Sequence, residues 1–292
     1  TMGKFISKTF ILLYLIWIIF LISTKINTYA LTLQFTLMPR TKSSFFMVIM
    51  GALIFFSLSK GIRTIFRFSE FILGPIIVLF ISLFAFSLTK IRADYLIPIS
   101  TDNLPSTIMA SRNVLAVGGY IIIALFFSDK YGIVVSKKQV RKLWVAIISF
   151  ILISFLVTIV TYGVTGSDLT ADLPFPFYIT VKSISLFNIL ERFEVLITLV
   201  CIISDFISIA IYAVMAIRCF IWLFDLNENT FLYVPLTFIL YYLTFYISST
   251  QFESDFFYSY VIVNSNLIFQ FVFPLIIGVM ALIRGKAIRK QY

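Results

Sequence analysis

Long hydrophobic runs alternate with short polar breaks along the whole chain. A membrane-spanning helix needs about 20 mostly apolar residues, because the hydrocarbon core of a bilayer is about 30 Å thick. The breaks are marked by Lys, Arg, Pro and small polar clusters. This pattern predicts eight spans, namely Phe5–Ser23, Phe45–Leu58, Phe68–Leu88, Leu104–Phe127, Leu143–Val164, Glu191–Phe224, Phe231–Ile247 and Tyr260–Ile283.

Some boundaries of these spans carry more detail. The first span is expected to continue as an amphipathic end through Lys25–Phe35. Lys60–Arg67 is predicted to be a basic connector, and Gly74-Pro75 to kink the third span. A long connection, Thr165–Leu190, precedes the sixth span, and an acidic loop, Ser248–Phe257, precedes the eighth.

Composition supports an all-α polytopic membrane protein. Hydrophobic residues make up 61% of the chain and charged residues 12%, whereas soluble domains carry about 25% charged residues. No polar block is long enough for a separate soluble domain, so residues 1–292 are expected to form one transmembrane domain. No signal peptide is visible.

The net charge of +10 would suggest nucleic acid in a soluble protein. Here it indicates basic cytoplasmic loops beside an anionic leaflet, so the expected partner is the lipid bilayer and not nucleic acid. If the C-terminal tail is cytoplasmic and the spans alternate, most Lys and Arg residues fall on the cytoplasmic side. Both termini of this chain are therefore expected in the cytoplasm.

The sixth span carries a carboxylate near its middle, at Asp205. A charge at membrane depth costs about 3 kcal/mol on insertion scales, so it usually faces a polar interior. Helical spacing places Cys201, Asp205, Ser208 and Tyr212 on one stripe. The alternative is a neutral Asp205 that is satisfied by a neighbouring Ser or lies near the outer interface. Ser204 and Ser208 supply further polar groups beside it.

The fourth span contains Arg112 and then Gly118, Gly119 and Tyr120. Two glycines weaken a helix where no water can satisfy the backbone. One interpretation is a discontinuous helix whose freed backbone groups bind a small solute. The other is close packing of helices through small residues.

Three further groups of polar or aromatic residues are candidates for a role inside the membrane. Arg112 needs a partner or a wet cavity, and Asp205 is the hypothetical partner. Tyr14 and Trp17 share a helix face, for which aromatic packing is the default and a substrate lid the sharper hypothesis. The polar patch in the last span, Asn264, Asn266 and Gln270, favours hydrogen bonds between helices over ligand contacts.

No catalytic constellation is present. The chain has no His, no phosphate-binding loop and no cluster with the spacing of metal ligands. Cys201 and Cys219 lie in one apolar run, which indicates neither a disulfide nor a thiol metal site. An enzyme, a metal and a cofactor are therefore not expected.

Three stretches resemble the B subunit of bacterial spore germinant receptors, the spore permease family. They are RFSEFILGPIIVLF at Arg67–Phe80, the region Gly118–Lys142 with its GGY and Lys-rich loop, and Leu173–Ile217. Within the last, ILERFE in Asn188–Glu194 looks like the family's entry to its eighth helix. The resemblance covers most of the chain.

The resemblance implies a fold and a role. The family belongs to the amino acid–polyamine–organocation superfamily, whose LeuT-type fold has ten helices in two inverted repeats. This chain is then expected to hold eight of ten, lacking the first two, with helices 3–5 in residues 1–103 and helices 6–10 in residues 104–292. The implied role is nutrient sensing in the spore inner membrane, with A and C subunits as partners and an amino acid-like ligand.

The ligand site implied by the resemblance lies midway along the first, third, sixth and eighth helices. The expected contacts are Gly118, Gly119, Tyr120, Ser204, Asp205, Ser208 and Tyr14. Tyr120 stands where the family often has an acidic residue, and Ser208 where it often has Lys. An amino acid or amine permease coupled to protons through Asp205 is the alternative, and a carboxylate without a basic neighbour would suit a cationic solute. A truncated, non-functional paralogue is the third.

Overall fold

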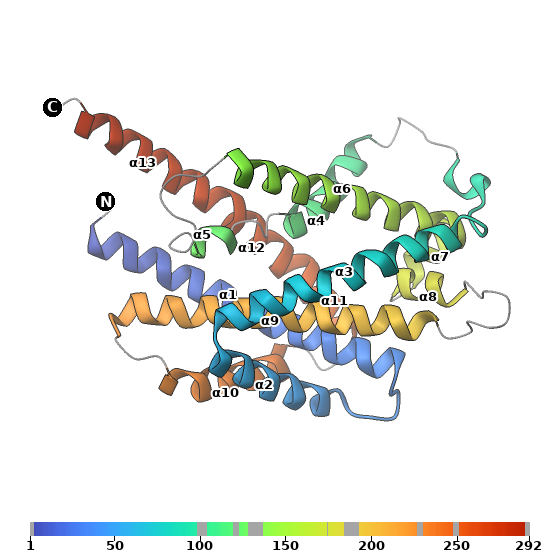
Figure 1. Ribbon diagram of the computed structural model, residues 1–292, viewed down its shortest axis with the longest axis horizontal. Coiled ribbons are helices and arrows are strands. Elements are labelled where there is room, and N and C mark those ends of the chain that lie inside the picture. Colours follow the sequence, from blue (N-terminus) through green and yellow to red (C-terminus); the bar gives the residue numbers. More distant parts are fainter. Residues whose placement is uncertain are drawn as a thin grey trace. The chain divides into compact units, whose positions relative to one another are not determined.

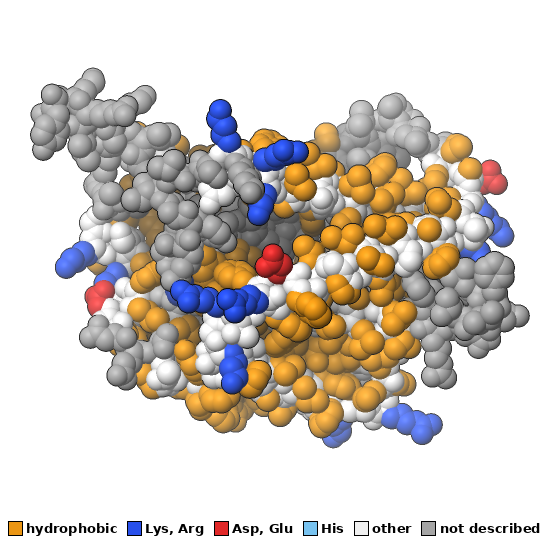
Figure 2. Space-filling model, in the orientation of Figure 1, with side chains coloured by type: hydrophobic (Ala, Val, Ile, Leu, Met, Phe, Trp, Pro, Cys, Tyr) orange, Lys and Arg blue, Asp and Glu red, His pale blue; other side chains and the backbone are white. Residues whose placement is uncertain are grey.

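A computed structural model of the chain describes residues 3–97, 104–118, 123–127, 137–173, 175–183, 193–226, 230–247 and 251–289. All regular elements in these ranges are helices, as expected. Seven of them are long and apolar enough to cross a membrane, namely Lys4–Thr36, Ser43–Lys60, Ile62–Ser87, Gln139–Thr165, Val195–Phe224, Thr230–Ile247 and Phe252–Met280. On the face drawn in Figure 2, hydrophobic side chains predominate, as a lipid-facing surface requires.

Within the remaining expected span, Leu104–Phe127, the structure describes two shorter helices. The helix α4 (Leu104–Gly118) ends at the first glycine of the pair, and α5 (Ile123–Phe126) follows. Residues 119–122 lie outside the described ranges. Neither piece reaches the length of about 20 residues that a crossing needs. The number of eight spans therefore stays a prediction.

The chain divides into two compact units. Unit 1 comprises Thr1–Phe66, Pro105–Phe127 and Ser204–Tyr292, and unit 2 comprises Arg67–Leu104 and Ser128–Ile203. The prediction is a single domain with a boundary between two internal repeats after residue 103. The compact units do not test a boundary between repeats, so it stays a prediction.

Three helices of unit 1 pack against one another: α1 (Lys4–Thr36), α2 (Ser43–Lys60) and α10 (Tyr233–Ile247) (Figure 1). As expected, α1 continues well past Ser23. Its buried Ser23 and Thr24 hydroxyls each donate to a carbonyl one turn earlier, at 2.9 Å. Because these polar groups are satisfied within the helix, they can be buried at little cost.

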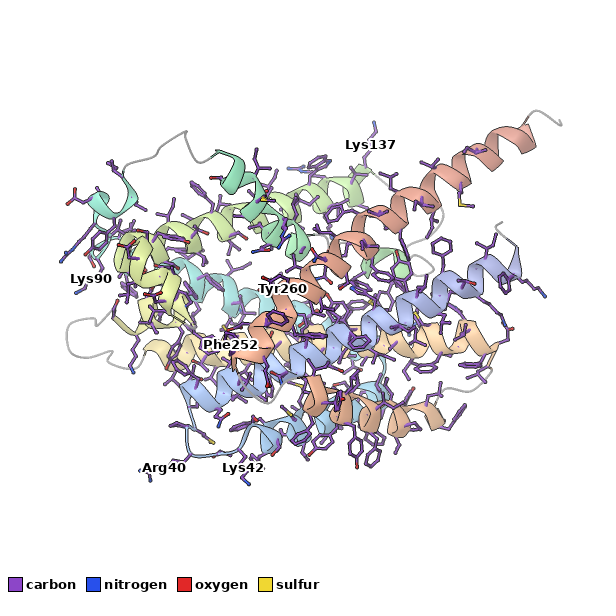
Figure 3. The ribbon with its side chains drawn as sticks, turned by 180° about the vertical axis from the view of Figure 1, so that it is seen from behind. Arg40, Lys42, Lys90, Lys137, Phe252 and Tyr260 are labelled. Carbon is purple, nitrogen blue, oxygen red and sulfur yellow. The ribbon has the colours of Figure 1, made fainter. Side chains whose placement is uncertain are left out.

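Helix α2 begins two residues before the predicted span Phe45–Leu58 and ends two residues after it. Arg40 and Lys42, in the turn before it, point away from the helices (Figure 3). At the other end Gly61 has φ 78°, and its N–H donates to the carbonyl of Ser57 at 3.1 Å. Glycine adopts this φ without steric cost and so stops the helix. The next helix, α3 (Ile62–Ser87), starts immediately, so the expected connector Lys60–Arg67 is reduced to one residue.

Unit 2 is built on α6 (Lys137–Thr165), which contacts three short helices: η1 (Ala93–Leu96), α7 (Ser167–Asp172) and α8 (Pro176–Ser183). The expected long connection after α6 is thus partly helical. Pro176 starts α8, a position where its missing N–H costs nothing. Leu83, Val181 and Ile197 form a buried cluster that joins α8 to α3 and to the first turns of the next long helix.

The segment before η1 lies closely against α6. The N–H of Arg92 donates to the carbonyl of Gly163 at 2.8 Å. A Cβ on Gly163 would lie 2.9 Å from a methyl carbon of Ile91. The absence of a side chain at this position therefore allows the segment to approach the helix.

Two more long helices contribute to unit 1, which includes the first of them only from Ser204 on. The sixth expected span is α9 (Phe193–Phe224). The eighth is continuous helix from α11 (Gln251–Phe257) through η6 (Tyr258–Ile262), α12 (Val263–Leu267) and η7 (Ile268–Val272) to α13 (Phe273–Arg289). The expected acidic loop is therefore helical from Gln251 on. The elements η6 and η7 are π-helical turns, and Phe252 and Tyr260 (Figure 3) are exposed.

Candidate functional site

Helix α1 lies antiparallel to α9 within unit 1 (Figure 1). Lys8 forms an ion pair with Asp225 at 2.7 Å. Farther along, Tyr14 interacts electrostatically with Cys219, and Lys25 with Asp205. Along these three interactions the residue numbers rise on α1 while they fall on α9, so the two helices run antiparallel. From Lys8 to Lys25 these three interactions extend over about 26 Å of α1, at a rise of 1.5 Å per residue.

Asp205 interacts electrostatically with two side chains of α1, Lys25 and Tyr29. Both Lys25 and Asp205 are half-buried. Lys25 and Tyr29 are one turn apart, so they lie on the same face of α1. Lys25 is therefore a basic neighbour of Asp205 inside the membrane-spanning segment. The expectation of a cationic solute was based on a carboxyl group without such a neighbour.

Arg112 is the partner that the sequence suggested for Asp205. It lies on α4 with an exposed side chain, and no ion pair between these two described residues is present. The functional role of Arg112 stays a prediction. The sequence placed Lys25 at the start of the expected amphipathic end Lys25–Phe35 and indicated no partner for it. The signal for its burial was the apolar residues that continue after it, including Ile26 and Ala30.

The other predicted ligand contacts are dispersed. Ser208 is half-buried, and its hydroxyl donates to the backbone carbonyl of Asp205 at 2.9 Å, whereas Ser204 is exposed. Gly118 is the last residue of α4, and Gly119 and Tyr120 lie outside the described ranges. Tyr14 faces Cys219, which is about 21 Å along α9 from Asp205 at 1.5 Å per residue. One small solute does not reach both Tyr14 and Asp205.

Tyr14 instead belongs to a buried polar network with the last helix. Its hydroxyl donates to the carbonyl of Phe269 at 2.8 Å. The indole N–H of Trp17 donates to Asn266 Oδ1 at 3.0 Å, and Asn266 Nδ2 donates to the carbonyl of Ala116 at 3.4 Å. The expected hydrogen bonds between helices at Asn266 are therefore confirmed. Phe269 lies in η7, and a π-helical turn alters the usual backbone hydrogen bonding.

The two helical pieces of the fourth span are each held at the carboxyl end. The last carbonyls of a helix have no donor within it. Asn266 supplies one to Ala116, in the last turn of α4. Arg218 Nη1 supplies one to Phe126, the last residue of α5, at 2.8 Å. The Arg218 guanidinium carbon also lies 4.7 Å from the centroid of the Phe127 ring.

Aromatic rings surround Tyr14. The rings of Phe126, Phe269 and Phe273 lie 5.4, 5.4 and 5.8 Å from its centroid, all in edge contacts. The ring of Trp17 stacks on Phe269 at 5.3 Å. The predicted aromatic packing of Tyr14 and Trp17 is thus confirmed, and it joins α1 to α5 and the last helix.

Outside the spans, one carboxyl has a perturbed pKa. The hydrogen bond from Lys8, together with the charge of Lys8, lowers the pKa of Asp225. Asp225 follows the end of α9 and has φ 52°. Both side chains of this pair are solvent-exposed.

The helices and their buried polar network define a multi-pass α-helical membrane protein. The chain belongs to the spore germination protein family, whose model matches residues 1–257. This is not a family of enzymes. Comparison with curated proteins and with solved structures yielded no match.

Proposed function

We propose that this chain is the membrane subunit of a spore germinant receptor, which senses an amino acid or similar small nutrient and triggers germination. The observation that carries the proposal is membership of the spore germination protein family over residues 1–257. The proposed location is the spore inner membrane, with cytoplasmic termini, and the proposed partners are the A and C subunits of the receptor.

Helix lengths in unit 1 support a LeuT-type core. The 33-residue α1 is followed by the 18-residue α2, and the 32-residue α9 by the 15-residue α10. Helix α1 is antiparallel to α9, and α2 packs against α10. Two inverted repeats place their equivalent helices in this manner. The long-then-short pairs are therefore the proposed third and fourth, and eighth and ninth, helices of the fold.

Two helix ends in the fourth span support a solute site. Its pieces α4 and α5 end at Gly118 and Phe126. Side chains from two other helices, Asn266 and Arg218, bind carbonyls at those ends. Such contacts stabilise a discontinuous helix inside a membrane, where backbone groups need partners. A solute that binds beside these helix ends would bias two arrangements of the core, and the partner subunits would respond.

Two measurements on the complete receptor test the proposal. The reconstituted complex is melted with each of the 20 common L-amino acids, and uptake of any stabilising one into proteoliposomes is then measured. A sensor shows stabilisation without flux, and spores that lack this chain lose their response to the same nutrient. Flux identifies a secondary permease instead, and absence of any stabilisation contradicts the proposal.

A further inference from the structure

The first turns of α6 carry a cluster of positive charge. Four of the six residues from 137 to 142 are Lys or Arg, and the first turn of the helix holds no acidic residue. The N-terminus of a helix is itself partly positive, so cations there are destabilising unless an anion compensates them. Among the described residues, no carboxylate forms an ion pair with Lys137, Arg141 or Lys142. An anion from outside the described part of the chain would therefore stabilise this cluster.

The cluster lies where α6 enters its expected membrane span. The part of α6 that is long and apolar enough to cross a membrane begins at Gln139. Trp144 follows within two turns, and Trp is enriched at the boundary between bilayer and water. Side chains on a helix lean toward its N-terminus, and Lys137 projects outward from the first turn (Figure 3). Lys137 and Arg141 therefore reach toward the level of the phospholipid phosphates.

One face of α6 continues this cluster into an apolar surface, which we call the α6 stripe. Its members follow one another at intervals of four and three residues and are all exposed, namely Lys137, Arg141, Trp144, Ile148, Ile151 and Phe155. From Trp144 to Phe155 the helix rises about 17 Å. Half of the hydrocarbon core of a bilayer measures about 15 Å. The apolar part of the stripe thus matches the length of an acyl chain in one leaflet.

The packing of unit 2 leaves the stripe uncovered. Helix α6 contacts η1, α7 and α8. Its buried residues, among those that the structure describes, are Val160, Thr161 and Gly163, which all follow the stripe. In contrast, Trp144 is 59% exposed and Phe155 64% exposed. The stripe therefore contributes little to the packing of the unit that carries it.

The side chains of the stripe favour a lipid over a partner helix. Helices that associate in a membrane approach each other through small residues, and the stripe contains only large ones. The small residues Ala146 and Ser149 lie on other faces of α6. Basic residues at the end of a membrane-spanning helix attract anionic headgroups. A phospholipid offers both the negative charge and the apolar chain that the stripe can bind.

We propose that the α6 stripe binds an anionic phospholipid. Its phosphate lies beside Lys137 and Arg141, and one acyl chain lies along the apolar side chains from Trp144 to Phe155. The phosphate then supplies the negative charge that the start of α6 lacks. This inference requires only that the chain spans a membrane, so it does not depend on the proposed function.

The test uses the fluorescence of Trp144, which bromine atoms on an adjacent acyl chain quench. The full chain, with any subunits that copurify with it, is reconstituted in phosphatidylcholine vesicles. The vesicles contain either brominated phosphatidylglycerol or brominated phosphatidylcholine, and Trp144→Phe identifies the signal of Trp144. Quenching is expected to be stronger with phosphatidylglycerol. Lys137 and Arg141 should each contribute a factor of about five to this preference.

Three charge variants distinguish a site from a diffuse surface charge. Lys137→Gln and Arg141→Gln are each expected to lower the preference about fivefold. Lys142→Gln is the matched control, because it removes the same charge beside Arg141 but on another face of α6. It should lower the preference by at most about twofold. All three side chains are exposed, so the variants should fold.

Each contrary result overturns the proposal. Equal losses in the three variants indicate a diffuse attraction without a site. A Trp144 signal that neither brominated lipid quenches means that protein covers the stripe. Glycerophosphoglycerol, the same headgroup without acyl chains, should leave the quenching unchanged, and displacement of the lipid by it assigns the cations to a soluble phosphate. These results are distinct from the nutrient response that tests the proposed function.

Discussion

Lys25 of α1 faces Asp205 of α9, and Tyr29 lies one turn farther along α1 on the same side. Both charged residues are half-buried in helices that are long and apolar enough to cross a membrane. Opposite charges in such a setting are strongly interdependent, because removal of one leaves the other uncompensated.

Lys25→Met and Asp205→Asn are each expected to lower the free energy of unfolding by about 1–3 kcal/mol, less than for a fully buried pair. The double variant should recover a substantial part of the loss, because no lone charge remains. Melting temperatures of the four proteins in detergent measure the coupling. Additive losses in the double variant would contradict the pairing. The same cycle with Arg112→Met tests the pair that the sequence suggested.

Arg218 joins α9 to α5 through a hydrogen bond and a ring contact. Arg218→Ala is expected to destabilise the protein by about 1–3 kcal/mol, because it removes a charge-assisted hydrogen bond. Arg218→Lys should recover less than half, since an ammonium lacks the planar geometry that serves both contacts. Melting curves give the loss, and equal stability of Lys and Arg at this position would contradict the prediction.

Gly163 is the position where a side chain should be least tolerated. A Cβ there would lie 2.9 Å from Ile91. Gly163→Ala is expected to cost about 1–3 kcal/mol of stability through overpacking. Gly51→Ala is the control, because nothing lies within 4 Å of its added Cβ, and it should be neutral or mildly stabilising. If Ile91→Ala fails to relieve the Gly163→Ala defect, the clash is not its cause.

The Lys8–Asp225 pair should make stability depend on acidic pH. Lys8 lowers the pKa of Asp225 in the folded protein. The contribution is therefore complete above the unfolded pKa, near 4, and is lost as pH falls through the lower folded pKa. Asp225→Asn should flatten this part of the melting temperature profile between about pH 5 and pH 2. Because both side chains are exposed, the effect should be small and should shrink in high salt.

The sequence by itself determined the class of protein. Apolar runs of bilayer length report a membrane protein directly, since each span must satisfy its own backbone and cover it with apolar side chains. The family followed from segments such as Arg67–Phe80, and the family match bears it out. The two glycines at Gly118 and Gly119 were also visible as an unusual feature of an apolar run, and the discontinuous helix that they suggest stays a prediction.

The tertiary structure decided which polar residues meet. Lys25 was expected in an amphipathic end of the first span, yet in the structure it interacts electrostatically with Asp205 of α9. Tyr14 and Asp205 were expected to share a site. Tyr14 instead interacts with Cys219, which lies about 21 Å along α9 from Asp205 at 1.5 Å per residue. Helical period specifies the face on which a residue lies but not its depth relative to another helix. That depth depends on how the helices pack against one another. The sequence therefore could not show that Asn266 binds Trp17 and Ala116, whereas the Gln270 amide has no hydrogen-bond partner among the described residues.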